Sequence, residues 1–264
     1  MLSTLFPDPL RRTLAQAVVA AAAAFLVALA ALRRQVRVER DLAIALARGL
    51  AQIAAVGSVL LLMLRGPGWL AAVALAAMTV AAASTSARRA QRLPGAFWIS
   101  LRAIGAGAGS VIAVMALAGV VETRVTVAVP VGSMLIAAAM NANSLALERF
   151  RAEVTAHARE IEAALALGAS GDVAVGPYLR SAYGASLAPP IDNLRSLGIV
   201  WIPGLMTGMV LSGTPPLRAA VYQFVTLAMI VASAGLTCLV GTGLARARAI
   251  SPAEQLVLRP GAEG

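Results

Sequence analysis

The chain of 264 residues is 59% hydrophobic and only 13% charged, and its mean hydropathy is +0.82. So few charged residues cannot cover the surface of a soluble domain of this size, so the composition excludes a soluble globular fold. The formal net charge is +10, but the basic residues are all arginine and gather at the ends of apolar runs. They form no stripe interleaved with aromatic residues, which argues against nucleic acid as a partner.

Seven stretches are apolar over about 20 residues, the length that crosses a bilayer as a helix. They are Leu14–Leu32, Leu42–Leu64, Trp69–Ser86, Ala96–Val121, Val125–Leu147, Leu197–Gly213 and Leu217–Ala245. The predicted fold is all-α, a polytopic membrane protein of about seven transmembrane helices that form one permease domain over residues 1–264. A cleaved signal peptide is the alternative interpretation of the first stretch, because Arg11 and Arg12 precede it.

Arginine clusters orient these stretches, since basic residues are enriched on the cytoplasmic side. The clusters are Arg33, Arg34, Arg37 and Arg40 after the first stretch, Arg88, Arg89 and Arg92 after the third, Arg149, Arg151 and Arg159 after the fifth, and Arg246 and Arg248 after the seventh. All four fall on one side if there are seven spans. This predicts an outside N-terminus and a cytoplasmic C-terminus in a bacterial inner or plasma membrane.

The segment 148–196 between the fifth and sixth stretches is the longest polar part of the chain, and we expect it to form a cytoplasmic helical loop. Apolar residues at helical spacing, and the absence of proline from Val131 to Leu167, predict one continuous helix about 55 Å long. Gly168 would end this helix. A short second helix, Pro177–Ala185, is expected to follow, with proline in its first turn, before Pro189–Pro190 breaks the chain.

Several polar residues fall inside the predicted spans, where an unpaired polar group is costly and usually faces a cavity or the bundle interior. The candidates for a substrate pathway are Arg48, Gln52, Met134, Asn141, Asn143, Met206, Thr207, Met209 and Gln223. Structural roles stay open as alternatives. Arg48 can extend its side chain to the membrane interface, the asparagines can hydrogen-bond neighbouring helices, and the methionines can pack in the core. Within the sixth stretch, Pro203 and Gly204, together with Gly208, predict a broken or kinked helix.

Metal ligands are scarce in these spans. Cys238 and His157 are the single residues of their kinds, and no carboxylate falls within the seven stretches. Methionine thioethers suit Cu(I) better than iron. We therefore assign no metal site from the sequence.

The cytoplasmic loop contains Glu162-Ala163-Ala164 with Gly168 six residues after the glutamate. This resembles the EAA loop of ABC permeases, in which a helix, a glycine turn and a second helix dock into the ATPase subunit. The resemblance implies an ATPase-coupling set of Glu148, Arg149, Glu162, Gly168, Pro177, Tyr178 and Arg180. The chain has no Gly-x-x-x-x-Gly-Lys-Ser/Thr loop, so a separate partner subunit would bind and hydrolyse ATP, with no cofactor in this chain.

A wider resemblance covers most of the chain, about Arg48 to Arg248. The segments PVGSMLIAAAMNANSLALERF (Pro130–Phe150), EAALALGAS (Glu162–Ser170) and IDNLRSLGIVWIPGLMTGMVLSGTPPLRAAVYQF (Ile191–Phe224) are similar to the FetB family, bacterial ABC permeases associated with iron export, with plant relatives in aluminium tolerance. The resemblance implies seven spans and an assembly of two permeases with two ATPases, exporting iron or another metal.

The sequence departs from the family pattern at Ser133, Leu205 and Met209, so the resemblance implies the fold more firmly than the substrate. Three alternatives stay open: an ABC permease for a nucleotide sugar or an amphiphile, an ion-coupled secondary transporter, and a membrane scaffold without transport activity.

Overall fold

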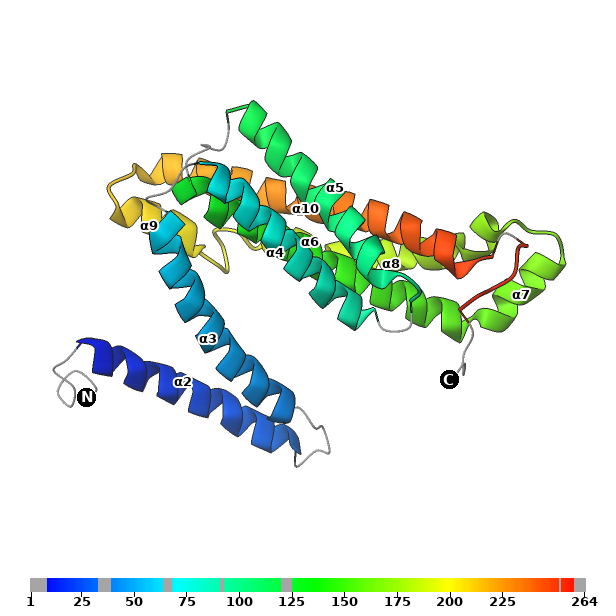
Figure 1. The fold of residues 1–264 in the computed structure, drawn as a ribbon, viewed down its shortest axis with the longest axis horizontal. Helices are drawn as coiled ribbons and strands as arrows, with labels where there is room; N and C mark the ends of the chain where they lie inside the picture. The colour runs from blue at the N-terminus through cyan, green and yellow to red at the C-terminus, as the bar shows by residue number, and fades with distance from the viewer. Residues whose placement is uncertain are drawn as a thin grey trace. The chain divides into compact units, whose positions relative to one another are not determined.

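The computed structural model describes residues 9–32, 39–63, 68–90, 93–119, 125–251 and 253–258. Throughout these residues the chain is helical apart from turns, loops and two isolated β-bridges, which confirms the predicted all-α class (Figure 1). The chain divides into two compact units, residues 1–66 and 67–264, each with its own internal packing.

The first unit contains the helices α2 (Pro9–Leu32) and α3 (Glu39–Met63), which pack against each other. Both consist largely of alanine, leucine and valine, which favour helix or fit an apolar solvent. Their large apolar side chains stay exposed, for example Val27 at 71% and Ile53 at 72%. Such surfaces are stable in lipid rather than in water.

The second unit contains four helices that are long and apolar enough to cross a membrane: α4 (Trp69–Arg89), α5 (Ala96–Leu117), α6 (Val125–Ala156) and α10 (Pro216–Ala249). Small residues occupy their contacts, including Ala83, Ala103 and Ala139, all fully buried. Small side chains let helix backbones approach closely, which is how helices associate in lipid. The predicted count of seven spans and the predicted orientation stay predictions.

A further long helix, α8 (Gly171–Arg195), occupies part of the predicted cytoplasmic loop. The prediction of a short helix Pro177–Ala185 was wrong, because α8 begins at Gly171 and continues through Pro177 and through Pro189–Pro190. Packing against α6 and α10 offsets the backbone hydrogen bonds that the prolines remove. Figure 1 shows α8 running alongside α10 in the opposite direction.

The predicted sixth span was also wrong. Of Leu197–Gly213, only α9 (Gly204–Leu211) is helical, and its eight residues extend about 12 Å, far less than the roughly 30 Å of a bilayer core. Pro203 precedes the first residue of α9, Gly204, and Gly208 lies within it. The residues before Pro203 form an irregular loop.

The single 55 Å helix predicted to leave the fifth span is interrupted. α6 ends at Ala156, His157 adopts a non-helical conformation (φ −107°, ψ 23°), and α7 (Ala158–Ala166) continues from there. Nothing in the hydrophobic pattern marks His157, because the break changes direction without changing the buried face. Gly168 ends this region with φ +89°, as expected of a glycine after a helix.

Candidate functional site

A buried polar junction joins three helices of the second unit. The Asn143 side-chain amide on α6 donates to Ser86 Oγ on α4 at 2.9 Å and to Ser100 Oγ on α5 at 3.1 Å. The two serine hydroxyls are also bonded to each other at 3.3 Å. All three residues are at most 1% exposed. The geometry makes Asn143 a fully buried link between three helices.

Two glycines bring α10 against this junction. Gly241 of α10 lies against Asn143 Oδ1, and Gly107 of α5 lies against the Thr237 backbone, where an added Cβ would be 2.8 Å from Thr237 Cα. Asn143 Oδ1 and Thr237 Oγ1 have no hydrogen-bond partner among the described residues. The two glycines therefore let α10 approach α5 and α6 closely at this junction.

Asn141 and Met134 lie on a different face of α6 from Asn143. Pro130, Met134, Ala137 and Asn141 are all exposed and follow each other at intervals of four, three and four residues, so they form one stripe, which we call the α6 stripe. Around α6, helix α4 packs against α5, α5 against α10, and α10 against α8. This order leaves the α6 stripe between α4 and α8.

The other pathway candidates are dispersed. Gln223 on α10 is 1% exposed, and neither of its amide atoms has a partner among the described residues. On α9, Met206 and Met209 are half-buried, while Thr207 is exposed and donates to the Pro203 carbonyl at 3.3 Å. Arg48 and Gln52 are exposed residues of α3, in the other unit.

One of the predicted ATPase-coupling residues, Tyr178, lies at the junction of α6, α7 and α8. The His157 ring stacks on Tyr178 of α8, with ring centroids 4.8 Å apart and planes 26° apart. The Tyr178 hydroxyl donates to Glu160 of α7 at 3.1 Å. Burial, followed by the hydrogen bond and negative charge of Glu160, raises the pKa of the Tyr178 hydroxyl, so it stays a donor. These contacts fasten the break at His157 to α8.

The remaining coupling candidates surround this junction. Glu148 and Arg149 are exposed on α6, Glu162 is exposed on α7, and Gly168 forms the turn that leads to α8. Pro177 and Arg180 lie on α8 and are exposed. The structure thus gathers all seven at one end of the second unit.

A C-terminal strap, residues 250–251 and 253–258, folds back over this same end, and no sequence pattern predicted it. Leu256 and Leu258 are buried in the cluster that contains Phe150 and Val175. Glu254 adopts φ +54°, and its carboxylate accepts a hydrogen bond from the Gly171 backbone N–H at 2.7 Å. The strap therefore caps the N-terminus of α8.

A second contact ties α8 to α10 nearby: Asp172 and Arg246 form an ion pair at 3.2 Å. Between α7 and the strap lies a recess of about 260 Å³, lined by Glu162, Leu165, Ala166, Glu254, Gln255 and Leu256. The α7–α8 loop is thereby connected to both α6 and α10.

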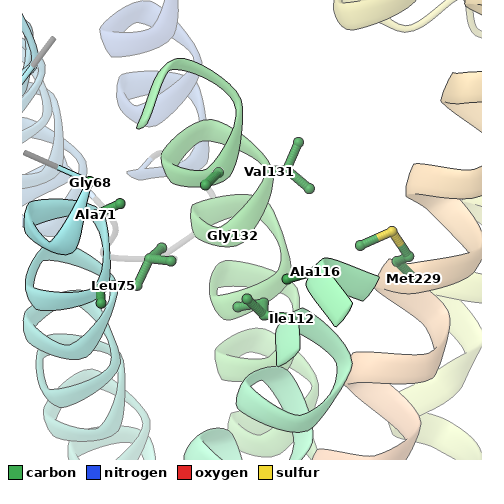
Figure 2. Close-up of a pocket in the computed structure, with 10 residues that line it drawn as sticks. Gly68, Ala71, Leu75, Ile112, Ala116, Val131, Gly132 and Met229 are labelled. Atoms are coloured by element: carbon green, nitrogen blue, oxygen red, sulfur yellow. The ribbon is translucent and has the colours of Figure 1, made fainter. Parts of the chain in front are cut away.

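At the opposite end, α4, α5, α6 and α10 enclose an apolar cavity of about 190 Å³ (Figure 2). Leu75, Ile112, Val131 and Met229 line it, and Gly132 lets Leu75 approach α6. None of the pathway candidates lines it. It offers apolar contact alone, without a group that could orient a polar substrate.

Within the described residues, no three histidine, cysteine or acidic side chains cluster as a metal site would require.

Comparison with known proteins gives one family. Residues 14–250 match the uncharacterised protein family UPF0014. The chain is 30% identical to the UPF0014 membrane protein YjkA of Bacillus subtilis over 77% of this chain and 82% of that protein. It is 29% identical to the probable iron export permease protein FetB of Escherichia coli, over 67% of this chain and 68% of the relative. It is 28% identical to the UPF0014 membrane protein STAR2 of rice, over 78% and 73%. No solved structure matches it.

Proposed function

Because the chain belongs to the UPF0014 family of multi-pass membrane proteins, we propose that it is the membrane-spanning subunit of an ABC exporter. In this proposal two copies form the pathway, a separate ATPase subunit binds ATP, and iron or another metal ion is exported. Its relative FetB is named as a probable iron export permease, which supports both the metal and the direction of transport.

The observation that carries the proposal is the construction of the α7–α8 loop. An ATPase outside the membrane can move the spans only through a stiff connection. Here Tyr178 and His157 connect the loop to α6, while the strap and the pair Asp172–Arg246 connect it to α10. A push on the loop therefore acts on both long helices, and the recess beside Glu162 offers the ATPase a place to insert a side chain.

The α6 stripe supports the use of two copies. Asn141 is the polar residue of the exposed α6 stripe, whose other members Pro130, Met134 and Ala137 are apolar, and such a residue is costly against lipid. Two copies facing each other across their stripes would shield it and enclose a path between them. Met134 on the same stripe would add a soft, adaptable surface to that path.

The coupling is tested by purifying the chain with its proposed ATPase subunit and reconstituting both in lipid. We expect Gly168→Ala and Glu162→Ala to hydrolyse ATP with little transport, because the first strains a turn at φ +89° and the second alters the recess. Gly243→Ala, a helical glycine with no atom within 4 Å of its added Cβ, is the control. Transport per ATP that is equal in all variants would refute the loop's role.

A further inference from the structure

The helix α8 runs antiparallel to α10 and ends before the level at which α10 begins (Figure 1). Its register against α10 is set by Ser186, whose hydroxyl donates to Cys238 Sγ at 3.2 Å. The helices are antiparallel, so Asp192, six residues and about 9 Å beyond Ser186, lies level with Ala232 of α10.

Two helices independently place this level at the middle of the membrane. α10 carries no charged residue between Arg218 and Arg246, and Ala232 stands halfway between them. Ser233, next to Ala232, donates to the Leu135 carbonyl of α6 at 3.3 Å. On α6, Leu135 is next to the midpoint of the uncharged stretch between Arg124 and Glu148. With these two uncharged stretches centred in the bilayer, Asp192 lies at mid-depth, whereas the predicted span boundaries had placed it outside the bilayer.

The end of α8 at this depth is polar, and its charged side chains are exposed. Arg195 pairs with Asp192 at 3.3 Å, and their side chains are 77% and 66% exposed. Asn193 is exposed beside them. Exposed charges at mid-depth are not stable against hydrocarbon, so this face must border water or protein.

The backbone around these residues has unused acceptors. In the loop 196–203, the carbonyls of Leu197, Ile199 and Val200 accept no hydrogen bond from a backbone N–H of the described chain. Within α8, Pro189 and Pro190 lack the N–H groups that would bond the carbonyls one turn earlier, four residues before each proline. Irregular backbone at membrane depth is tolerated where it lines a cavity, and broken helices form ion sites in transporters.

We propose that the break between α8 and α9 is the cation-binding element of the pathway, with the Asp192 carboxylate as its charged ligand. The Asn193 side-chain oxygen and the free loop carbonyls supply further oxygen ligands, the kind that hard divalent cations prefer. Arg195 neutralises Asp192 when the site is empty and is displaced when the cation binds. This inference rests on the proposed function for its role in transport, but the binding itself does not require the ATPase.

The test is Mn²⁺ binding, followed by electron paramagnetic resonance, to the full chain in phosphatidylcholine nanodiscs without the ATPase. Asp192→Asn should weaken binding by about tenfold or more, because ligand charge sets the affinity of oxygen sites. Arg195→Gln should strengthen binding, because it removes the competing cation. The matched control is Asp172→Asn, which breaks the other Asp–Arg pair of α8, at the cytoplasmic end.

The two variants are expected to change Mn²⁺ affinity in opposite directions. This distinguishes an effect on the site from misfolding, since a folding defect would weaken binding in both variants. Equal binding in wild type and Asp192→Asn, or weaker binding in Arg195→Gln, would overturn the proposal. Because the ATPase is absent, failure here leaves the ABC assignment standing. Conversely, ATP hydrolysis that drives no transport, in a protein that still binds Mn²⁺, would count against the ABC assignment and leave the cation site standing.

Discussion

At the scale of single residues, the glycines at the helix contacts are the most sensitive positions. We expect Gly107→Ala and Gly241→Ala each to lower stability by about 1–3 kcal/mol, because the new methyl group would overlap the Thr237 backbone or Asn143. Thermal unfolding in detergent measures this. Gly105→Ala and Gly109→Ala on the same α5, with open space around them, should change little.

Equal effects at buried and open glycines would show that helix propensity, not close packing, sets the outcome.

The two asparagines of α6 should separate stability from transport. Asn143→Ala removes two hydrogen bonds to Ser86 and Ser100, and we expect a loss of about 1–2 kcal/mol. Asn141→Ala, on the exposed stripe, should leave the unfolding temperature unchanged and lower the transport rate. Thermal unfolding and proteoliposome flux of the same preparations test both. A stable, inactive Asn143→Ala protein would contradict this division.

Sequence reasoning could not decide between these two residues. Both asparagines lie in the same apolar stretch, two positions apart, so the pattern shows only that they point to different faces of a helix. Which face is buried depends on where α4 and α5 present Ser86 and Ser100, residues 57 and 43 positions away in the chain. Only the three-dimensional packing supplies that information.

At the scale of elements, the strap should act on the α7–α8 loop through Glu254. Glu254→Ala removes the cap at Gly171, so amides in the first turn of α8 should exchange hydrogen faster. Gly171→Ala should do the same, because its Cβ would lie 2.9 Å from the Glu254 carboxylate. Hydrogen exchange followed by mass spectrometry tests this.

The double variant should exchange no faster than Glu254→Ala alone, since both changes remove one contact. Additive effects would mean that the cap is not the link between strap and loop.

The elements also show where sequence patterns suffice. Hydropathy alone located α4, α5, α6 and α10, because each buries small residues in a uniformly apolar stretch. It failed for α8, whose three prolines and charged residues are typical of a loop. There the neighbours α6 and α10 decide the structure, since they cover one face of the helix. It failed again for Leu197–Gly213, which is apolar enough to span but is broken before Pro203.

At the scale of the whole molecule, α8, the loop 196–203 and α9 together replace the predicted sixth span. If this discontinuous segment crosses the bilayer, the number of crossings stays seven, and the arginine clusters stay on one side. The proposed cation site also puts the Asp192 carboxylate at mid-depth, and intramembrane carboxylates are typical of ion-coupled carriers as well. The energy source of transport, ATP or an ion gradient, therefore distinguishes the proposed ABC permease from an ion-coupled carrier.

The most direct measurement is metal accumulation in proteoliposomes that contain the chain and its ATPase subunit, with the ATPase facing outward. Fe²⁺ kept reduced in the outer solution is the substrate. Our account predicts accumulation that requires ATP and the ATPase subunit and survives a protonophore. Accumulation without ATP that disappears when the proton gradient is removed would contradict it and identify an ion-coupled carrier.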